Sequence, residues 1–286
     1  MHPRTTATAA GVAATVSTAL LLTGCGGSTA GPSGKVAANC KPAHEFRTVK
    51  PKTLTVGVIA SLPYSSINPV SGKWEGIDAE FGTAIAAKEC LTVSTVAVSG
   101  ADAIQSLDSG KVDLLSAGAY ITPARGKVVG QTEPLYYQYT VVVSRTSIGT
   151  VHQLRGYQIG ALSGSAYVQP LRTWLGSGNV REYPSTADLL ADVQNRRLDV
   201  AVAASGEANY QLAKAEYTGL NATRLKPNSA TTNLEPVYGV NMPYGKSNTA
   251  LGEALNADIA AIRANGTTKK ILTKWKLNDH LTLNGK

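Results

Sequence analysis

The chain has few residues of the kinds that build metal centres and nucleophilic active sites. Of its 286 residues, 3 are cysteine and 4 are histidine. The histidines are scattered, and their spacing indicates no metal site. A Gly-x-Ser-x-Gly elbow and a Ser-x-x-Lys motif are both absent from the sequence. We therefore expect neither a metal nor another cofactor, and no catalytic residues.

Dense runs of one charge are also missing. Lys and Arg number 27 against 19 Asp and Glu, which gives a formal net charge of +8. A modest excess of this kind fits a protein near an anionic envelope and is weak evidence for nucleic-acid binding. Charged residues at 16% and aromatic residues at 6% are ordinary for a globular protein. We expect no nucleic-acid partner.

The apolar run near the N-terminus is too short to span a bilayer. It covers residues 13–22, follows a basic start at His2 and Arg4, and ends just before Gly24. This is the layout of a secretory signal over residues 1–24. The sequence Leu22-Thr23-Gly24-Cys25 also resembles a bacterial lipobox, in which the cysteine becomes the lipid-bearing first residue. We expect a protein outside the cytoplasm, anchored to the cell membrane by a lipid on Cys25. The alternative is an ordinary signal that ends near a cysteine.

Two cysteines remain in what would be an oxidising compartment. Cys40 and Cys90 form an even pair there, which favours a disulfide over two unpaired thiols. Residues 26–38, rich in Gly, Ser, Ala and Pro, read as a flexible tether, with ordered structure starting near Cys40.

Strand and helix patterns alternate along the rest of the chain. β-Branched runs predict strands and periodic apolar residues predict helices. The expected strands are residues 54–59, 92–98, 112–117, 157–162 and 198–202. The expected helices are residues 77–89, 104–107, 166–175 and 188–194, a start at Thr122-Pro123, and two near the C-terminus before a loose tail from Asn278. This order predicts an α/β protein with mostly parallel sheet.

One unit of this pattern occurs twice. Residues 104–114 and 190–200 each read as a helix, a short basic turn, an Asp and a strand. Two such halves predict two lobes with a ligand cleft between them, since pockets favour domain interfaces. We expect residues 25–50 to be the lipidated N-terminus and tether, 51–141 with 241–286 to be lobe 1, and 142–240 to be lobe 2. The chain would cross between lobes near residues 139–144 and 238–241.

Several ordered motifs carry a resemblance to a known family. They are Val56-Gly57, Pro63-Tyr64, Gly76-Ile77-Asp78-Ala79-Glu80-Phe81, the stretch 113–125 ending in Thr122-Pro123-Ala124-Arg125, the segment 132–137, and the C-terminal stretch 256–275. Over roughly residues 52–277 the chain resembles the family 3 extracytoplasmic solute-binding proteins, the receptors of ABC importers for polar amino acids. The resemblance implies a two-lobe fold like the periplasmic binding proteins of type II.

Site residues follow partly from chemistry and partly from this resemblance. An Arg guanidinium is a rigid fork that suits a carboxylate, and the resemblance implies that Arg125 grips the ligand's carboxylate. It also places the backbone of Gly118 and Tyr120 in the pocket and the Gly164-Ser165 turn on the opposite lobe. A plain helix cap is the alternative role for Ser165. Tyr64, Trp74 or Tyr120 would form an aromatic floor, with Tyr64 favoured.

The chain departs from the family pattern at one position. Members that bind amino acids have an acidic residue for the ligand's ammonium where this chain has Ala204. Glu207 or Glu133 would replace it, or the ligand lacks an ammonium there. Asp78 and Glu80 could suggest a catalytic pair, but we interpret them as capping and packing residues at a helix start.

We therefore expect a monomeric binding protein that captures a small, amino-acid-like solute and delivers it to an ABC permease. One alternative is a dehydratase-type enzyme on the same fold, for which only Glu207 or Glu133 could serve as the acid. Another is a ligand-sensing receptor without transport.

Overall fold

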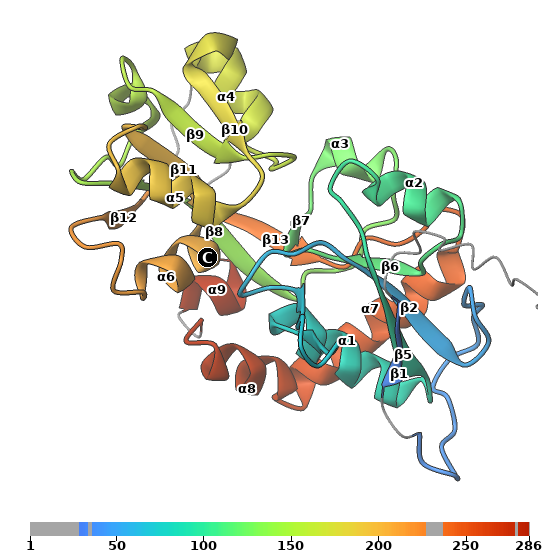
Figure 1. The fold of residues 1–286 in the computed structure, drawn as a ribbon. Coiled ribbons are helices and arrows are strands. Elements are labelled where there is room, and N and C mark those ends of the chain that lie inside the picture. The colour runs from blue at the N-terminus through green and yellow to red at the C-terminus, as the bar shows by residue number, and fades with distance from the viewer. Residues whose placement is uncertain (1–28, 34–35, 227–236, 278–279, 286) are drawn as a thin grey trace, which may run out of the picture.

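The computed structural model describes residues 29–33, 36–226, 237–277 and 280–285. The expected signal, residues 1–24, and Cys25 lie outside these ranges. The described chain folds into two α/β lobes, one around β2 and one around β9, joined by crossing strands (Figure 1). Within the described ranges, no helix is long and apolar enough to cross a bilayer.

The first lobe is built on a four-stranded sheet. Its strands, in sheet order, are β1 (Thr29–Ser33), β5 (Thr92–Ala97), β2 (Thr53–Val58) and β6 (Leu114–Ser116). The central strand β2 is buried along its whole length and pairs in parallel with both neighbours. Strands β2, β5 and β6 were predicted from the sequence. Edge strand β1 is antiparallel and lies within the stretch expected to be a tether.

Five helices and a small hairpin belong to this lobe. They are α1 (Ile77–Lys88), α2 (Ala103–Asp108), α3 (Pro123–Gly126), α7 (Thr249–Ala264), α8 (Thr267–Lys274) and the hairpin of β3 (Ser66–Ile67) with β4 (Trp74–Glu75). The apolar spacing that predicted α1 holds, because Ile77, Phe81 and Ile85 are all buried. Helix α1 packs against both α7 and α8.

A mixed sheet forms the centre of the second lobe and continues through the crossing strands β8 and β13 to β7 of the first lobe. Its strands, in sheet order, are β10 (Val180–Tyr183), β9 (Ile159–Leu162), β11 (Val200–Ala204), β8 (Tyr136–Ser144), β13 (Val237–Asn241) and β7 (Ala119–Tyr120), with β12 (Asn221–Arg224) also paired to β8. β10, β9 and β11 are parallel, but every pair that includes β8 or β13 is antiparallel. The expectation of mostly parallel sheet is therefore wrong here, because β8 and β13 run in opposite directions as the chain leaves and returns.

Helices and turns complete this lobe. They are α4 (Val168–Leu175), α5 (Thr186–Gln194), α6 (Ser205–Leu212) and the short 3-10 turns Val151–Leu154 and Ser177–Asn179. Helices α4 and α5 were predicted, whereas α6 and strands β10 and β12 were not. A final helix, α9 (His280–Asn284), lies against β8 in the region expected to be a loose tail.

The two copies of the repeated unit make equivalent hydrogen bonds through their Asp residues. Asp113 accepts the backbone N–H of Thr55 on the adjacent strand at 2.7 Å, and Asp199 accepts that of Gln158 just before β9 at 2.8 Å. Each Asp thus holds the start of its own strand to the neighbouring parallel strand, which explains why the same residue type recurs at the same place.

The two crossing strands join the lobes side by side. β8 pairs with β13 from Tyr136 opposite Val240 to Tyr139 opposite Val237. The predicted lobe boundaries, at 141/142 and 240/241, both fall inside these continuous strands. The boundaries themselves stay a prediction.

The predicted Cys40–Cys90 disulfide is present. The S–S distance is 2.00 Å and the Cα atoms are 5.7 Å apart. Because Cys90 follows Glu89, the C-cap residue of α1, the bond fixes the N-terminal extension to the end of that helix.

Candidate functional site

Arg125 lies where the lobes meet. It belongs to α3, which begins after Thr122, and the Thr122 side chain accepts the backbone N–H of Arg125 at 3.2 Å. The Thr-Pro start was predicted, and Pro123 occupies the first helical position, where its missing N–H costs nothing. This short helix fixes the backbone from which the guanidinium reaches the second lobe.

The Arg125 guanidinium binds neutral carbonyl oxygens from both lobes. Nη1 donates to the Tyr120 carbonyl at 3.0 Å, and Nη2 donates to the Gly164 carbonyl at 3.0 Å. Within the described part of the chain no carboxylate forms an ion pair with it. Burial lowers the pKa of this guanidinium, although it stays charged at any physiological pH. A partly buried cation without an anion is a natural carboxylate receptor.

Tyr64 connects the lobes through its hydroxyl group. The side chain is buried, and the hydroxyl accepts the backbone N–H of Glu207 at 3.1 Å while donating to the Gln138 side-chain oxygen. Burial raises the pKa of this phenol well above 10, and the Glu207 carboxylate raises it further. Tyr64 is therefore a neutral donor that spans the interface, as well as the aromatic residue that the sequence favoured.

Two glycines, Gly118 and Gly206, leave room for the Tyr64 side chain against the backbone of both lobes. A Cβ at Gly118 would lie 2.4 Å from a ring carbon, and a Cβ at Gly206 would lie 2.5 Å from the hydroxyl oxygen. Gly118 also has a φ of +61°, a conformation that favours glycine. Its backbone N–H donates to Asp78 at 2.9 Å, so this donor is already occupied within the first lobe.

Tyr120 forms part of an aromatic wall. Its ring stacks on Tyr238 with centroids 4.4 Å apart, and it is buried on β7. The Tyr120 hydroxyl oxygen has no hydrogen-bond partner among the described residues. Burial raises its pKa well above 10. The structure thus brings Arg125, Tyr64 and Tyr120 to one interface, with Tyr167 buried nearby on the second lobe.

Glu207 is the acidic group of this interface. It lies in the first turn of α6 and is only 4% exposed. Its carboxylate accepts hydrogen bonds from Ser61 on the first lobe and from Thr186, at 3.2 Å, on the second. Burial raises its pKa, and in the described ranges no basic side chain forms an ion pair with it. A buried carboxylate held by hydroxyl groups alone suits a cationic ligand group.

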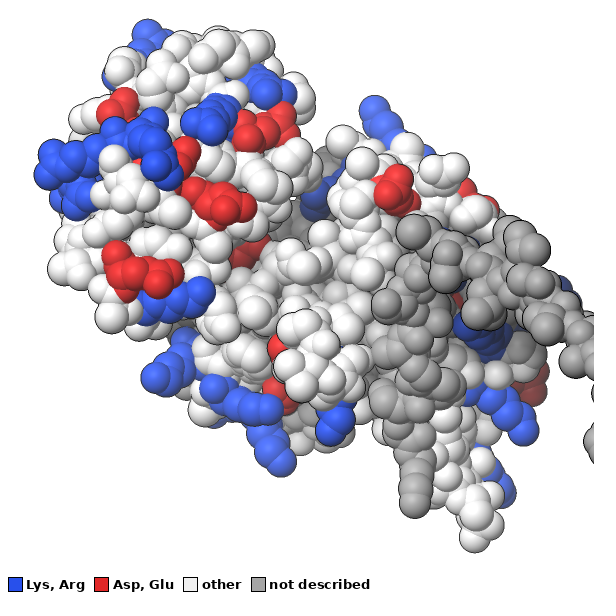
Figure 2. Space-filling view, viewed as in Figure 1, with Lys and Arg blue, Asp and Glu red and all other residues white. Residues whose placement is uncertain are grey.

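A cavity of about 170 Å³ lies between the lobes beside Glu207. Its walls are residues 60–62 and Ser66 of the first lobe, and Leu162, 185–187 and Gln211 of the second. Both hydroxyl partners of Glu207, Ser61 and Thr186, belong to these walls. Arg125 does not line this cavity. In Figure 2 the visible surface where the lobes meet is mostly uncharged, whereas Lys and Arg gather on the outer side of the second lobe.

The Gly164-Ser165 turn of the second lobe contacts Arg125 through a backbone carbonyl. Gly164 has a φ of +75° and presents its carbonyl to the guanidinium. Ser165 does not cap α4, because Tyr167 is the N-cap residue and no side chain there accepts a capping hydrogen bond. The alternative role of Ser165 as a helix cap is therefore wrong.

Other candidate residues have structural roles. Asp78 is buried and accepts hydrogen bonds from the 116–118 loop and, at 3.1 Å, from Tyr136. Burial raises its pKa to about 6. Glu80 binds Lys274 at 2.7 Å and Trp275 at 2.8 Å, which ties α8 to α1. The interpretation of both acids as packing residues is confirmed, but the expected capping role is wrong, because the N-cap residue of α1 is Gly76 and no side chain accepts a capping hydrogen bond there.

Two other candidates lie away from the interface. Trp74 donates to Ser65 at 3.0 Å and packs over Gly82 on α1, so it belongs to the core of the first lobe. Glu133 is exposed and its backbone binds Asn256 of α7 at 2.7 Å. Glu133 and Glu207 were the two acids considered for the role of the acid that is missing at position 204. Of these two, Glu207 is the one that lies at the interface.

Sequence reasoning missed Ser61, Gln138 and Thr186. Nothing in the local sequence marks them, since Ser and Thr occur throughout the loops. Gln138 had one available signal, because it is a polar residue within the run of β8. Its side-chain oxygen accepts a hydrogen bond from the Tyr64 hydroxyl group and another, at 3.3 Å, from the backbone N–H of Gly206.

Comparison with known proteins identifies the family. A model of the bacterial extracellular solute-binding proteins, family 3, matches residues 54–278. The chain belongs to this family. Its curated relatives are amino-acid-binding proteins of ABC transporters. ABC transporter arginine-binding protein 1 of Escherichia coli is 28% identical over 60% of this chain and 69% of the relative. The histidine-binding periplasmic protein of Escherichia coli is 27% identical over 79% of this chain and 88% of the relative.

Solved structures agree on the fold. An ancestral arginine-binding protein bound to glutamine superposes with a TM-score of 0.69 at 24% identity, covering 80% of this chain and 99% of that one. The arginine-, lysine-, histidine-binding protein ArtJ of Geobacillus stearothermophilus gives a TM-score of 0.70 at 18% identity, covering 80% and 98%. The predicted two-lobe architecture of a type II periplasmic binding protein is confirmed.

Proposed function

We propose that this protein is the membrane-anchored receptor of an ABC importer and captures a small amino-acid-like solute between its lobes. The observation that carries the proposal is Arg125, a partly buried cation with no anionic partner in the described residues, placed where the lobes meet. A carboxylate on the ligand supplies the missing charge in a bidentate geometry.

The second charge of the ligand is matched by Glu207. This buried carboxylate interacts electrostatically with Tyr64, Tyr120 and Tyr167. Tyr120 and Tyr167 also interact with Arg125. One cation and one anion around a shared set of tyrosines are complementary to a zwitterion. Among the relatives are proteins named for binding arginine and histidine, which supports an amino-acid-like ligand here.

Capture would occur by closure of the lobes. The Arg125–Gly164 and Tyr64–Glu207 hydrogen bonds both run from one lobe to the other. The lobes are joined by the β8 and β13 strands, so a small change in these strands separates or joins the two halves of the site. The closed receptor then presents its ligand to a permease in the membrane, near which the lipid on Cys25 would concentrate it.

A thermal-shift screen of the purified protein tests this function. The library holds amino acids, their amides and decarboxylated analogues, and small organic acids. A ligand at 100 times its Kd adds about 2.7 kcal/mol of stability. Arg125→Ala should remove the shift, and Arg181→Ala, which removes a side chain that is 64% exposed, should keep it. A full shift in Arg125→Ala would contradict the proposed role of Arg125.

The anchor has its own test. Cys25→Ser should move the protein from the membrane fraction to the soluble secreted fraction when it is produced in a bacterium that makes lipoproteins. A variant that stays membrane-bound would refute the lipid anchor without touching the binding site.

One observation favours a second function, a dehydratase-type enzyme. Glu207 is a buried carboxyl with a raised pKa, which is what a general acid needs. The relatives named above are binding proteins, so we rank this function second. Incubation with prephenate-type acids decides it, because an enzyme converts them catalytically whereas a receptor returns them unchanged. A sensing receptor without transport would bind the ligand but fail to co-purify with a permease.

A further inference from the structure

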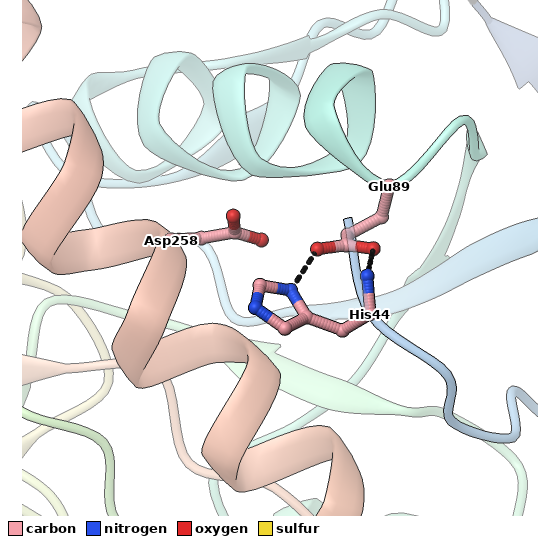
Figure 3. Close-up of side chains that lie close together, drawn as sticks. All are labelled: His44, Glu89 and Asp258. Carbon is pink, nitrogen blue, oxygen red and sulfur yellow. Dashed lines mark hydrogen bonds and ion pairs between the residues drawn. The ribbon is translucent and has the colours of Figure 1, made fainter. Parts of the chain in front are cut away.

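Three ligand-type side chains meet in the first lobe, and none of them belongs to the site described above. They are His44 from the N-terminal extension, Glu89 at the end of α1, and Asp258 within α7 (Figure 3). His44 Nδ1 lies 2.6 Å from one Glu89 oxygen, and the His44 backbone N–H donates to the other at 3.0 Å. One ligand atom from each of the three residues lies within 4.8 Å of the others.

The chain holds these residues together from three directions. Helices α1 and α7 pack side by side, which brings Glu89 opposite Asp258. The Cys40–Cys90 disulfide fixes the extension four residues before His44, directly beside Glu89. The spacing of the histidines could not show this arrangement, since its parts are far apart in sequence.

The two carboxylates of the cluster are buried, and Asp258 is incompletely satisfied. Glu89 is 2% exposed and Asp258 is 0% exposed. Both Asp258 oxygens lack a hydrogen-bond partner among the described residues, and the carboxylate points toward Glu89 and His44 (Figure 3). Asp258 forms an ion pair with Lys88, whose Nζ lies 3.5 Å from Oδ1 and whose side chain is 35% exposed. A buried carboxylate left without a hydrogen-bond donor is costly.

We propose that His44, Glu89 and Asp258 bind a divalent transition-metal ion, with Zn²⁺ as the best match. An imidazole nitrogen with two carboxylate oxygens is a ligand set that zinc accepts, and two carboxylates balance its charge. In a tetrahedral site with bonds of about 2.1 Å the ligand atoms lie roughly 3.4 Å apart. The 2.6 Å contact between His44 Nδ1 and Glu89 would therefore open, while separations of up to 4.8 Å would shorten, so each group needs to shift by about 1 Å.

An ion can reach this position. The His44 side chain is 36% exposed, and His44 and Glu89 both line a hollow in the surface beneath the extension. The fourth coordination position would face that hollow and take a water molecule. By joining the extension to both α1 and α7, the ion would act beside the disulfide as a second cross-link of the N-terminal segment.

A proton is the competing occupant. Burial raises the pKa of Asp258, and the neighbouring Glu89 carboxylate raises it further. The two acids could then share one proton with no metal present. A metal site would bind added zinc stoichiometrically, whereas a pair of acids that share a proton would not. A zinc titration therefore distinguishes the two hypotheses.

The experiment is calorimetric titration of the chelator-stripped protein with ZnCl₂, with MgCl₂ and CaCl₂ as separate arms. We expect one zinc per molecule and no comparable binding of the two alkaline-earth ions, which do not prefer a histidine ligand. Asp258→Asn and His44→Gln should each weaken zinc binding at least tenfold. His152→Gln, which changes an exposed histidine of the second lobe, should leave it unchanged.

Folding of the variants is checked by near-UV circular dichroism. In Asp258→Asn the new amide can donate to Glu89, so this variant should fold. Zinc should raise the melting temperature of the wild type and of His152→Gln but not of Asp258→Asn. The proposal is overturned if the wild type binds no stoichiometric zinc, or if both site variants bind it as tightly as the wild type. A higher melting temperature of Asp258→Asn without any zinc effect on the wild type would instead establish the shared proton.

Discussion

Replacing Glu207 by Gln should weaken ligand binding while stabilising the protein without ligand. The change keeps the shape of the side chain, and its amide can still bind both Ser61 and Thr186, because each hydroxyl group can turn to donate or accept. Only the charge is lost. The two effects therefore have opposite signs and share one cause, the burial of a carboxylate without a cation.

The size of the binding effect follows from the burial of Glu207. Removing one partner of a buried ion pair leaves the other charge uncompensated and costs about 3–5 kcal/mol. At about 1.4 kcal/mol for each factor of ten, Kd for a ligand with an ammonium group should rise on the order of 100-fold or more. A ligand without that group should bind both proteins equally.

The stability effect has a defined pH dependence. Because burial raises the pKa of Glu207 above its ordinary 4.5, the folded protein holds this proton more tightly than the unfolded chain does. The ionised group therefore lowers stability: this cost is absent below pH 4.5, grows as the pH rises from 4.5 to the folded pKa, and is complete above the folded pKa. The Gln variant should be more stable than the wild type at pH 8 and equal to it at pH 4. A gain of about 1 kcal/mol corresponds to roughly 2–4 °C in melting temperature for a protein of this size.

Calorimetry for Kd and thermal unfolding at several pH values measure both effects. Glu133→Gln is the matched control, because Glu133 is exposed and lies away from the site. It should change neither quantity. The reasoning is refuted if Glu207→Gln binds an ammonium-bearing ligand as tightly as the wild type, or if Glu133→Gln has the same effect.

Two further changes test the packing of the first lobe. Gly118→Ala would place a Cβ 2.4 Å from the Tyr64 ring. In denaturant unfolding it should lower the free energy of unfolding by about 1–3 kcal/mol more than Gly110→Ala does, because Gly110 has a similar φ of +66° but open space around it. Equal losses in the two variants would show that Tyr64 moves freely. Replacing both Cys40 and Cys90 by Ser opens a loop with a sequence separation of 50 and should lower the free energy of unfolding by about 4 kcal/mol. An unchanged melting temperature under oxidising conditions would contradict that role of the disulfide.

The sequence predicted the elements whose signals are local. β2 is fully buried and β-branched, α1 has regular apolar spacing, and the Thr122-Pro123 start marks α3. It did not predict β12 or the antiparallel pairs around β8. β12 has partly exposed, polar residues, and strand direction depends on how the chain crosses between lobes. That path is set by contacts distant in sequence, which no local pattern encodes.

The residues of the candidate site also fall into those that local motifs predicted and those that they did not. Arg125, Tyr64 and Gly118 stand in recognisable motifs, and the structure brings them to one interface. The groups that complete it, Ser61 and Gln138, come from a loop and a crossing strand and had no distinctive sequence signal.

Each charged group of the site is held by a neutral group of the opposite lobe. Arg125 of the first lobe binds the Gly164 carbonyl of the second, and Glu207 of the second binds the Ser61 hydroxyl of the first. Hydrogen bonds in which both partners are charged are stronger than those with a neutral partner. A zwitterionic ligand would therefore exchange weaker contacts for stronger ones at both charges. Because each exchanged contact spans the interface, binding and lobe closure would be coupled through the same two residues.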